Sequence, residues 1–132
     1  ACEVDEYAAQ FARECFDVSE HGKKIELKVA PAIETMQELV KAGRSFDLAF
    51  IDADKGGYID YLNLLLDTDL LAADGFICVD NTLMQGQPYL AESQRTDNGQ
   101  AIARFNRFVA DDPRVAPIMI PIRDGLTLIK RK

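Results

Sequence analysis

Two carboxylates and a lysine follow directly on an apolar stretch of this chain. Residues 46–51 read FDLAFI, and Asp52, Asp54 and Lys55 come immediately afterwards, ahead of two glycines. A charge that is buried without a partner is energetically costly. These side chains are therefore expected either at the open end of a sheet or against a ligand.

A second apolar stretch of the chain is also followed directly by polar side chains. Residues 76–79 are apolar, and Asp80 and Asn81 follow them. Ligands of α/β sheets bind at the carboxyl ends of the strands, where Asp52 and Asp80 would lie close together. Two carboxylates and an amide oxygen suit a hard divalent cation, Mg²⁺ first, with Ca²⁺ or Mn²⁺ as alternatives. The plainer interpretation is that Asp80-Asn81 only turns the chain out of its strand.

A site at these strand ends could use other polar side chains as well. Lys55 can act as a base if a nearby cation and a dry pocket lower its pKa, although a lysine after a strand is more commonly just solvated. Glu3 ends a short strand ahead of a helix, where nucleotide-binding folds place an acid on ribose hydroxyls. Acids after strands are common, so Glu3 alone is a weak signal. His21 lies in a polar turn and is given no role.

The spacing of apolar residues predicts the elements that position these side chains. Tyr7, Phe11 and Cys15 recur at helical spacing and predict a helix with one buried face. Residues 46–52 predict a strand that is buried on both faces. Asp124-Gly125 predicts a two-residue hairpin turn between the last two strands. The expected helices are 4–16, 31–43, 58–66 and 98–112, and the expected strands are 1–3, 24–30, 46–52, 75–81 and two within 115–132. This order predicts an open, mostly parallel α/β sheet that ends in an antiparallel hairpin.

Composition narrows the functional class. The 132 residues are 48% hydrophobic and 28% charged, with a formal net charge of −7. A negative chain without a basic stripe argues against nucleic-acid binding. The apolar runs are too short to cross a bilayer, and no signal peptide is expected. Cys15 and Cys78 are expected in the core of a cytoplasmic protein, since the cysteines lack disulfide or metal spacing.

Five segments together resemble the cation-dependent class I O-methyltransferases, the family of caffeoyl-coenzyme-A and catechol O-methyltransferases. The resemblance covers residues 1–132, and its most specific parts are IDADK, VDN and the closing hairpin. The segments are residues 3–15, 29–36, 46–62, 75–86 and 111–132.

The resemblance implies a methyl transfer from S-adenosylmethionine to one hydroxyl of a vicinal aromatic diol, with a divalent metal bound. A homodimer is expected as well, with no nucleic-acid or membrane partner. The loop of residues 82–100 would line the acceptor pocket, which leaves the acceptor's identity open. By the same resemblance, Asp52, Asp80 and Asn81 would bind the metal, and Lys55 would be the general base. Glu3 would bind the ribose of the methyl donor, and Ala32 would bind its adenine through the backbone N–H. Asp54 would lie at the amino-acid end of the donor, Tyr58 would form a wall of the pocket, and Asp52 would contact the donor as well.

The family has a glycine-rich turn after its first strand, and no such turn precedes Glu3 here. We therefore expect residues 1–132 to be the C-terminal two-thirds of a single Rossmann-like methyltransferase domain of roughly 200 residues or more. The first strand would be lacking, and the fragment alone would bind the methyl donor poorly. One alternative is a catalytically inactive methyltransferase-like module that binds a partner or dimerises. Another is a dehydrogenase-like dinucleotide binder, which predicts no pair of metal ligands at the strand ends.

Overall fold

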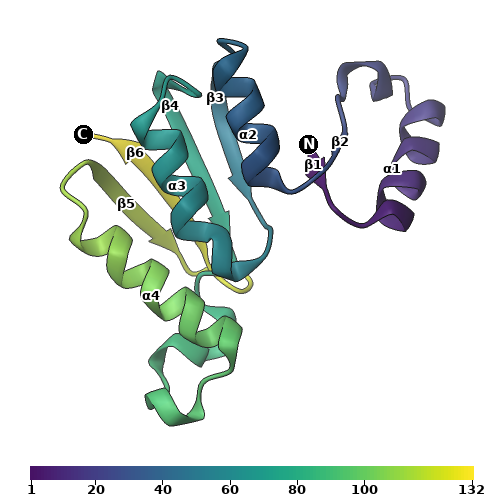
Figure 1. The fold of residues 1–132 in the computed structure, drawn as a ribbon. Coiled ribbons are helices and arrows are strands. Elements are labelled where there is room, and N and C mark those ends of the chain that lie inside the picture. The colour runs from purple at the N-terminus through teal and green to yellow at the C-terminus, as the bar shows by residue number, and fades with distance from the viewer. The chain divides into compact units, whose positions relative to one another are not determined.

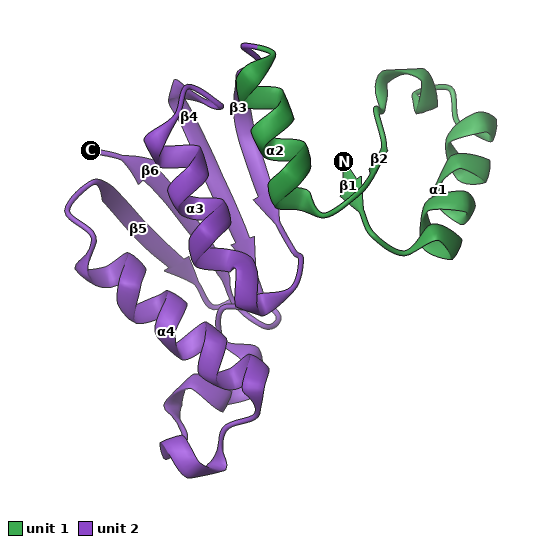
Figure 2. Ribbon diagram, viewed as in Figure 1, with its two compact units in different colours: residues 1–42 green, residues 43–132 purple.

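A computed structural model describes residues 1–132 as two compact units, residues 1–42 and residues 43–132 (Figure 2). Each unit combines helices with a sheet of its own (Figure 1). The predicted α/β class is confirmed. None of the helices combines the length and the apolar character that are needed to span a bilayer.

Unit 1 is built around two very short parallel strands. Glu3 of β1 pairs with Val29 of β2, and the N–H of Ala30 donates to the Glu3 carbonyl at 3.0 Å. The strand that was expected over residues 24–30 is reduced to two residues, because residues 22–24 form a 3₁₀ turn. The elements are β1 (Cys2–Glu3), α1 (Glu6–Val18), a 3₁₀ helix η1 (Gly22–Lys24), β2 (Lys28–Val29) and α2 (Ala32–Lys41).

Helix α1 forms as predicted, but its predicted burial is wrong. Tyr7 is 83% exposed and Phe11 61% exposed, and Cys15 is exposed as well. Ala9 is the only buried residue of the helix. The apolar spacing marked one face of the helix correctly, but two strands of two residues each cannot cover a helix of 13 residues.

Unit 2 contains a four-stranded sheet in the order β3-β4-β6-β5. Strands β3 and β4 are parallel, and β6 pairs antiparallel with both β4 and β5, so the predicted closing hairpin is confirmed. The elements are β3 (Phe46–Ile51), η2 (Lys55–Gly57), α3 (Tyr58–Asp67), β4 (Leu71–Asp80), η3 (Met84–Tyr89), η4 (Glu92–Gln94), α4 (Asp97–Asp111), β5 (Val115–Ile120) and β6 (Leu126–Arg131).

The core of unit 2 lies between this sheet and helices α3 and α4, which cover one of its faces (Figure 1). Alternate strand residues point to this face, as the pleat of a strand requires. Ile77 and Val79 are at most 1% exposed, and Tyr58 and Phe105 are fully buried. The rings of Tyr58 and Phe105 pack edge to face with centroids 5.5 Å apart. The beginning of α3 is thereby anchored on α4.

The opposite face of the same sheet is apolar and largely uncovered within unit 2. Leu48 is 50% exposed, Phe50 61% and Ile118 66%. The prediction that residues 46–52 are buried on both faces is therefore wrong for this unit, where β3 is an edge strand. Cys78 is half-buried rather than in the core, because it alternates with buried residues and faces this side.

The turn of the closing hairpin is longer than predicted. Ile120 pairs with Leu126, which leaves residues 121–125 in the turn. The Gly125 carbonyl accepts from Thr82 N at 3.1 Å, and the Asp124 carbonyl accepts from Leu83 N at 2.8 Å. These bonds to the segment after β4 replace the tight two-residue turn that Asp-Gly would favour locally.

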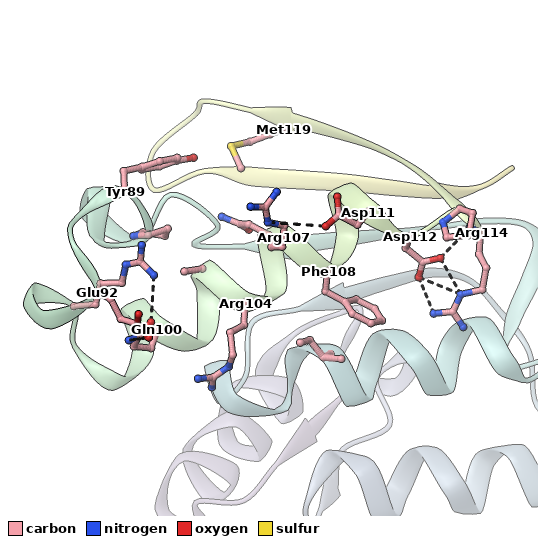
Figure 3. Close-up of a pocket in the computed structure, with 16 residues that line it drawn as sticks. Tyr89, Glu92, Gln100, Arg104, Arg107, Phe108, Asp111, Asp112, Arg114 and Met119 are labelled. Carbon is pink, nitrogen blue, oxygen red and sulfur yellow. Dashed lines mark hydrogen bonds and ion pairs between the residues drawn. The ribbon is translucent and has the colours of Figure 1, made fainter.

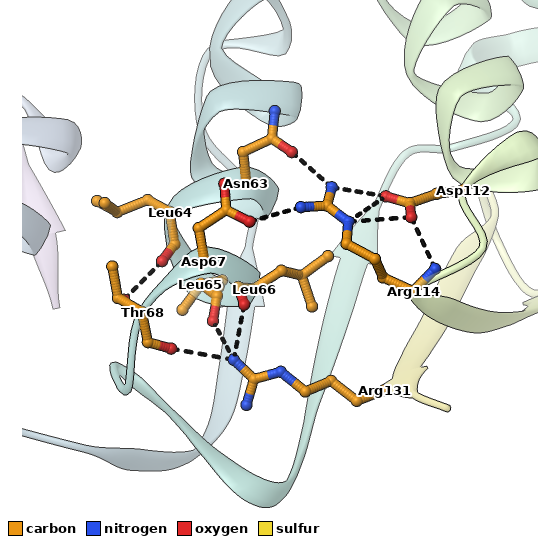
Figure 4. A network of polar contacts seen from close by, with 9 residues as sticks. All are labelled: Asn63, Leu64, Leu65, Leu66, Asp67, Thr68, Asp112, Arg114 and Arg131. Atoms are coloured by element: carbon orange, nitrogen blue, oxygen red, sulfur yellow. Dashed lines mark hydrogen bonds and ion pairs between the residues drawn. The ribbon is translucent and has the colours of Figure 1, made fainter.

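Arg131 closes the C-terminal end of α3 (Figure 4). Its guanidinium donates to the carbonyls of Leu65 at 2.8 Å, Thr68 at 3.0 Å and Leu66 at 3.2 Å. The last carbonyls of a helix have no intrahelical partner, so a cation there satisfies them. The last strand is thereby tied to α3.

Arg114 makes a second link to α3 (Figure 4). It donates to both carboxylate oxygens of Asp112, to Asp67 at 2.6 Å and to Asn63 at 2.7 Å. The Asp112 side chain is only 4% exposed. Its hydrogen bonds with Arg114 lower the pKa of Asp112 in spite of its burial, so this carboxylate stays ionised.

Candidate active site

The loop after β3 is held in shape by Asp54. One of its carboxylate oxygens accepts from the N–H of Gly57 at 2.9 Å and caps the 3₁₀ helix. The other accepts from the Tyr61 hydroxyl at 2.5 Å. Tyr61 is 8% exposed and was missed by sequence reasoning. Its position three residues after Tyr58, on the same face of α3, is the signal that could have found it.

The side chain of Lys55 is the centre of the candidate site. Its Nζ donates to Asp52 Oδ1 at 3.0 Å, to Asn81 Oδ1 at 2.7 Å and to the Tyr58 hydroxyl at 2.5 Å. The side chain is 11% exposed. Asp52 follows β3 and Asn81 follows β4, and Ile51 pairs with Val79 in the parallel register. The structure therefore brings together the side chains that were predicted from two separate strand ends.

Tyr58 packs against Lys55. Its hydroxyl donates to the Asp80 carbonyl at 3.2 Å, and its ring centroid lies 4.8 Å from Lys55 Nζ. The Asp80 carboxylate accepts from the N–H of Asn81 at 2.7 Å. Asp80 thus lies at the predicted strand end, with one carboxylate oxygen on the backbone of its neighbour. This orientation was not predictable from the sequence.

The protonation states follow from burial and from these contacts. Burial disfavours the Lys55 ammonium, but the hydrogen bonds with Tyr58 and Asp52 outweigh it and raise the pKa of Lys55. Burial also raises the pKa of Tyr58, against the opposing effect of Lys55. In this arrangement Lys55 is an ammonium and Tyr58 a neutral phenol at neutral pH. Lys55 can accept a proton only after its surroundings change.

A buried network fixes the turn that carries Asn81, which has a positive φ of 60°. Thr82 is fully buried, and its hydroxyl accepts from the Thr127 hydroxyl at 2.8 Å. Asn106 donates to the Thr82 carbonyl at 2.7 Å. Sequence reasoning missed Thr82, Asn106 and Thr127, because only the fold brings these distant positions together. They hold the turn that carries Asn81, and their hydrogen bonds do not involve Lys55.

Unit 1 carries the other two predicted residues. Glu3 Oε1 accepts from the N–H groups of Val4 at 2.7 Å and Asp5 at 2.8 Å. Neither bond uses the second oxygen of this carboxylate. Ala32 opens α2, where the first N–H groups have no intrahelical partner. Because β1 and β2 are parallel, both residues lie at the carboxyl end of that short sheet.

A hollow of about 1140 Å³ runs along α4 (Figure 3). Arg104 and Arg107 of α4 line it, together with Tyr89 and Arg95 from the loop of residues 82–100. None of the predicted cofactor, metal or catalytic residues lines this groove. Part of the predicted acceptor loop therefore borders a groove that is separate from the Lys55 centre.

The Lys55 centre fits a bound cation in its chemistry. Asp52 and Asn81 both direct a side-chain oxygen at one positively charged atom, and the Lys55 ammonium stands in for that cation. Oxygen donors of this kind suit a hard divalent ion. His, Cys, Asp and Glu alone form no group of three or more that could hold a metal, so the amide of Asn81 is essential to such a set.

Comparison with known protein families decides the affiliation of the chain. The model of the O-methyltransferase family matches residues 1–132. The chain belongs to the O-methyltransferase family. The resemblance that the sequence motifs indicated is confirmed, and the dehydrogenase-like alternative is set aside.

Individual O-methyltransferase relatives agree with this assignment. The probable caffeoyl-CoA O-methyltransferase 1 of Dictyostelium discoideum is 37% identical over 133 residues, which cover 99% of this chain and 57% of that protein. The caffeoyl-CoA O-methyltransferase of Petroselinum crispum is 35% identical over 118 residues, which cover 83% of this chain and 48% of that protein.

A solved methyltransferase structure agrees with this assignment. The SAH-bound methyltransferase of Podospora anserina superimposes with a TM-score of 0.87 at 32% sequence identity, over 99% of this chain and 59% of that one. The Rossmann-like α/β architecture of this chain is thus that of a methyltransferase. The chain spans about half the length of the relatives that it matches.

Proposed function

We propose that the whole protein transfers a methyl group from S-adenosylmethionine to one hydroxyl of a vicinal aromatic diol, with a divalent cation bound. The observation that carries this proposal is the convergence of Asp52 and Asn81 on one cationic atom at two adjacent parallel strand ends. Membership of the O-methyltransferase family and the likeness to an SAH-bound methyltransferase support it. SAH is what remains of S-adenosylmethionine after the methyl group has left.

The cation would be held by Asp52, Asp80 and Asn81, with Mg²⁺ as the first candidate. When bound, the ion would hold two adjacent hydroxyl oxygens of an acceptor and favour the ionised form of one, which is why a vicinal diol is the proposed class. Asp52 is well placed for this role because its side chain is 49% exposed and open to an entering ion. One oxygen of Asp80 is already used by Asn81 N, which leaves the other for a ligand.

The methyl donor would be bound by the five residues that the family resemblance implies. Glu3 would accept from the ribose hydroxyls with the oxygen that its own turn does not use. Ala32 would donate its N–H to the adenine. Asp54 would face the amino-acid end of the donor, in an orientation already fixed by Tyr61. Tyr58 would form a wall of the same pocket, and Asp52 would contact the donor as well as the cation.

Lys55 would take the proton from the acceptor hydroxyl at its Nζ. Its raised pKa shows that the ammonium is the stable form in the present arrangement. A second positive charge nearby disfavours an ammonium and lowers the pKa of a lysine. The resulting phenolate attacks the sulfonium methyl in line: the oxygen–carbon bond forms as the carbon–sulfur bond breaks, and sulfur keeps the electron pair. Both charges are neutralised, so exclusion of water favours the step.

The test is methyl transfer by the whole protein from isotope-labelled S-adenosylmethionine. Catechol is expected to be methylated in the presence of Mg²⁺ and to remain unmethylated in excess chelator. Resorcinol, whose hydroxyls are not adjacent, serves as the matched acceptor and is expected to react far more slowly. Transfer to both acceptors that is unaffected by the chelator would refute the cation-dependent mechanism. No transfer to any diol by a folded protein would favour the inactive binding module.

A further inference from the structure

The ammonium of Lys55 has no free donor. An ammonium carries three N–H groups, and Lys55 Nζ has three acceptors: Asp52 Oδ1, Asn81 Oδ1 and the Tyr58 hydroxyl. With 11% of its side chain exposed, it is held in place rather than solvated. Two of these three acceptors are the oxygens that a divalent cation would need.

A divalent cation and the ammonium compete for these oxygens. The two oxygens lie 3.0 Å and 2.7 Å from Lys55 Nζ, so an ion bonded to both would lie within about 5 Å of the ammonium. Divalent ions bind oxygens at about 2.0–2.6 Å. Two positive charges this close in a partly buried site repel each other.

We infer that Lys55 acts as an internal cation that holds the site together without metal, and that a divalent ion must displace it in order to bind. The inference rests on the proposed function and adds a control step to it. Asp52 lies on the solvent-exposed side of the centre, because its side chain is 49% exposed. An ion can enter there. The released amine would remain near Tyr58, whose ring and hydroxyl already contact it. Loading of the metal thereby frees the amine that the reaction needs.

The first test is Mn²⁺ binding to the whole protein, followed by electron paramagnetic resonance. Lys55→Met keeps the length of the side chain and removes the competing ammonium. It is expected to lower the Kd for Mn²⁺ at least tenfold, or about 1.4 kcal/mol. Lys24→Met, at an exposed lysine of η1, is the matched control for loss of one charge and should leave the Kd unchanged. The difference should persist at high salt, because competition for a contact is not screened as a distant charge is.

The second test needs no substitution. The amine of Lys55 is labelled with an amine-reactive reagent and quantified by mass spectrometry, with and without Mn²⁺. Its labelling is expected to rise severalfold when Mn²⁺ binds, while that of Lys24 stays constant.

Three results would overturn the inference, and they separate it from the proposed function. Equal Mn²⁺ affinity of parent and Lys55→Met would refute displacement but leave the metal site standing. Labelling of Lys55 that falls or stays constant when Mn²⁺ binds would do the same. Absence of Mn²⁺ binding to both proteins would refute the inference and the metal part of the proposed function together.

Discussion

Thr127→Val tests the network that holds Asn81 in place. Valine has nearly the shape of threonine and suits a strand, so the substitution removes the hydroxyl and little else. Thr127 is 5% exposed and Thr82 is fully buried, and their hydroxyls lie 2.8 Å apart. In the parent protein every buried side-chain polar atom has a partner. The substitution therefore creates a defect that is absent from the native fold.

The magnitude follows from which hydroxyl loses its partner. Thr127→Val leaves the Thr82 hydroxyl buried and unpaired, which costs about 1–3 kcal/mol of unfolding free energy. Thr82→Val leaves the Thr127 hydroxyl in the same position, with a similar cost. The double variant has no orphaned hydroxyl, and replacing both partners by apolar groups can be nearly neutral. The double variant is therefore expected to be about as stable as either single variant, or more stable.

Urea unfolding of the four proteins, followed by circular dichroism, measures the coupling. The sum of the two single losses should exceed the loss in the double variant by about 1–3 kcal/mol, since contacting residues couple in this range. Single losses that add to within about 0.5 kcal/mol would refute the reasoning, because they would show that the two hydroxyls do not depend on each other.

Three other predictions concern separate parts of the molecule. Glu3→Ala should weaken binding of S-adenosylmethionine by about 1.5–3 kcal/mol in calorimetry, the range for hydrogen bonds to a charged group, and unchanged affinity would contradict the ribose assignment. Lys55→Ala should slow methyl transfer by about 10²–10⁴-fold, with a smaller loss for more acidic acceptors, and a loss independent of acceptor acidity would rule out the base. Asp112→Asn should lower the unfolding free energy by about 1–2 kcal/mol at neutral pH, a value reduced because Arg114 is 38% exposed. The pKa of Asp112 is lowered on folding, so this loss of unfolding free energy should be complete above the unfolded-state pKa of about 3.9. It should vanish as the pH falls through the pKa of Asp112 in the folded protein. A loss that is the same at all pH values would refute the pairing of Asp112 with Arg114.

The convergence of Asp52 and Asn81 could be predicted because it depends on a general rule of parallel sheets. Carboxyl ends of adjacent parallel strands meet at one sheet edge, and the register of Ile51 with Val79 brings Asp52 and Asn81 to Lys55. The direction of the Asp80 carboxylate could not be predicted in this way. It depends on the local turn, where the nearest free donor is the N–H of Asn81.

Other features depend on contacts that no local pattern encodes. Helical spacing identified the apolar face of α1, but what covers a face is decided by the rest of the fold, and Tyr7 and Phe11 are exposed in unit 1. Asp124-Gly125 favours a tight turn by itself, yet the bonds from Thr82 and Leu83 draw it into a longer one. Tertiary hydrogen bonds outweigh turn preference there.

In the proposed mechanism, Asp52 and its neighbours hold the cation on which methyl transfer depends. The most direct measurement compares Mg²⁺-dependent methylation of catechol by the parent and by Asp52→Ala, with the affinity for S-adenosylmethionine measured on the same preparations. Turnover by the variant should be abolished at all Mg²⁺ concentrations while its donor affinity stays largely intact. Undiminished turnover by Asp52→Ala would contradict the claim.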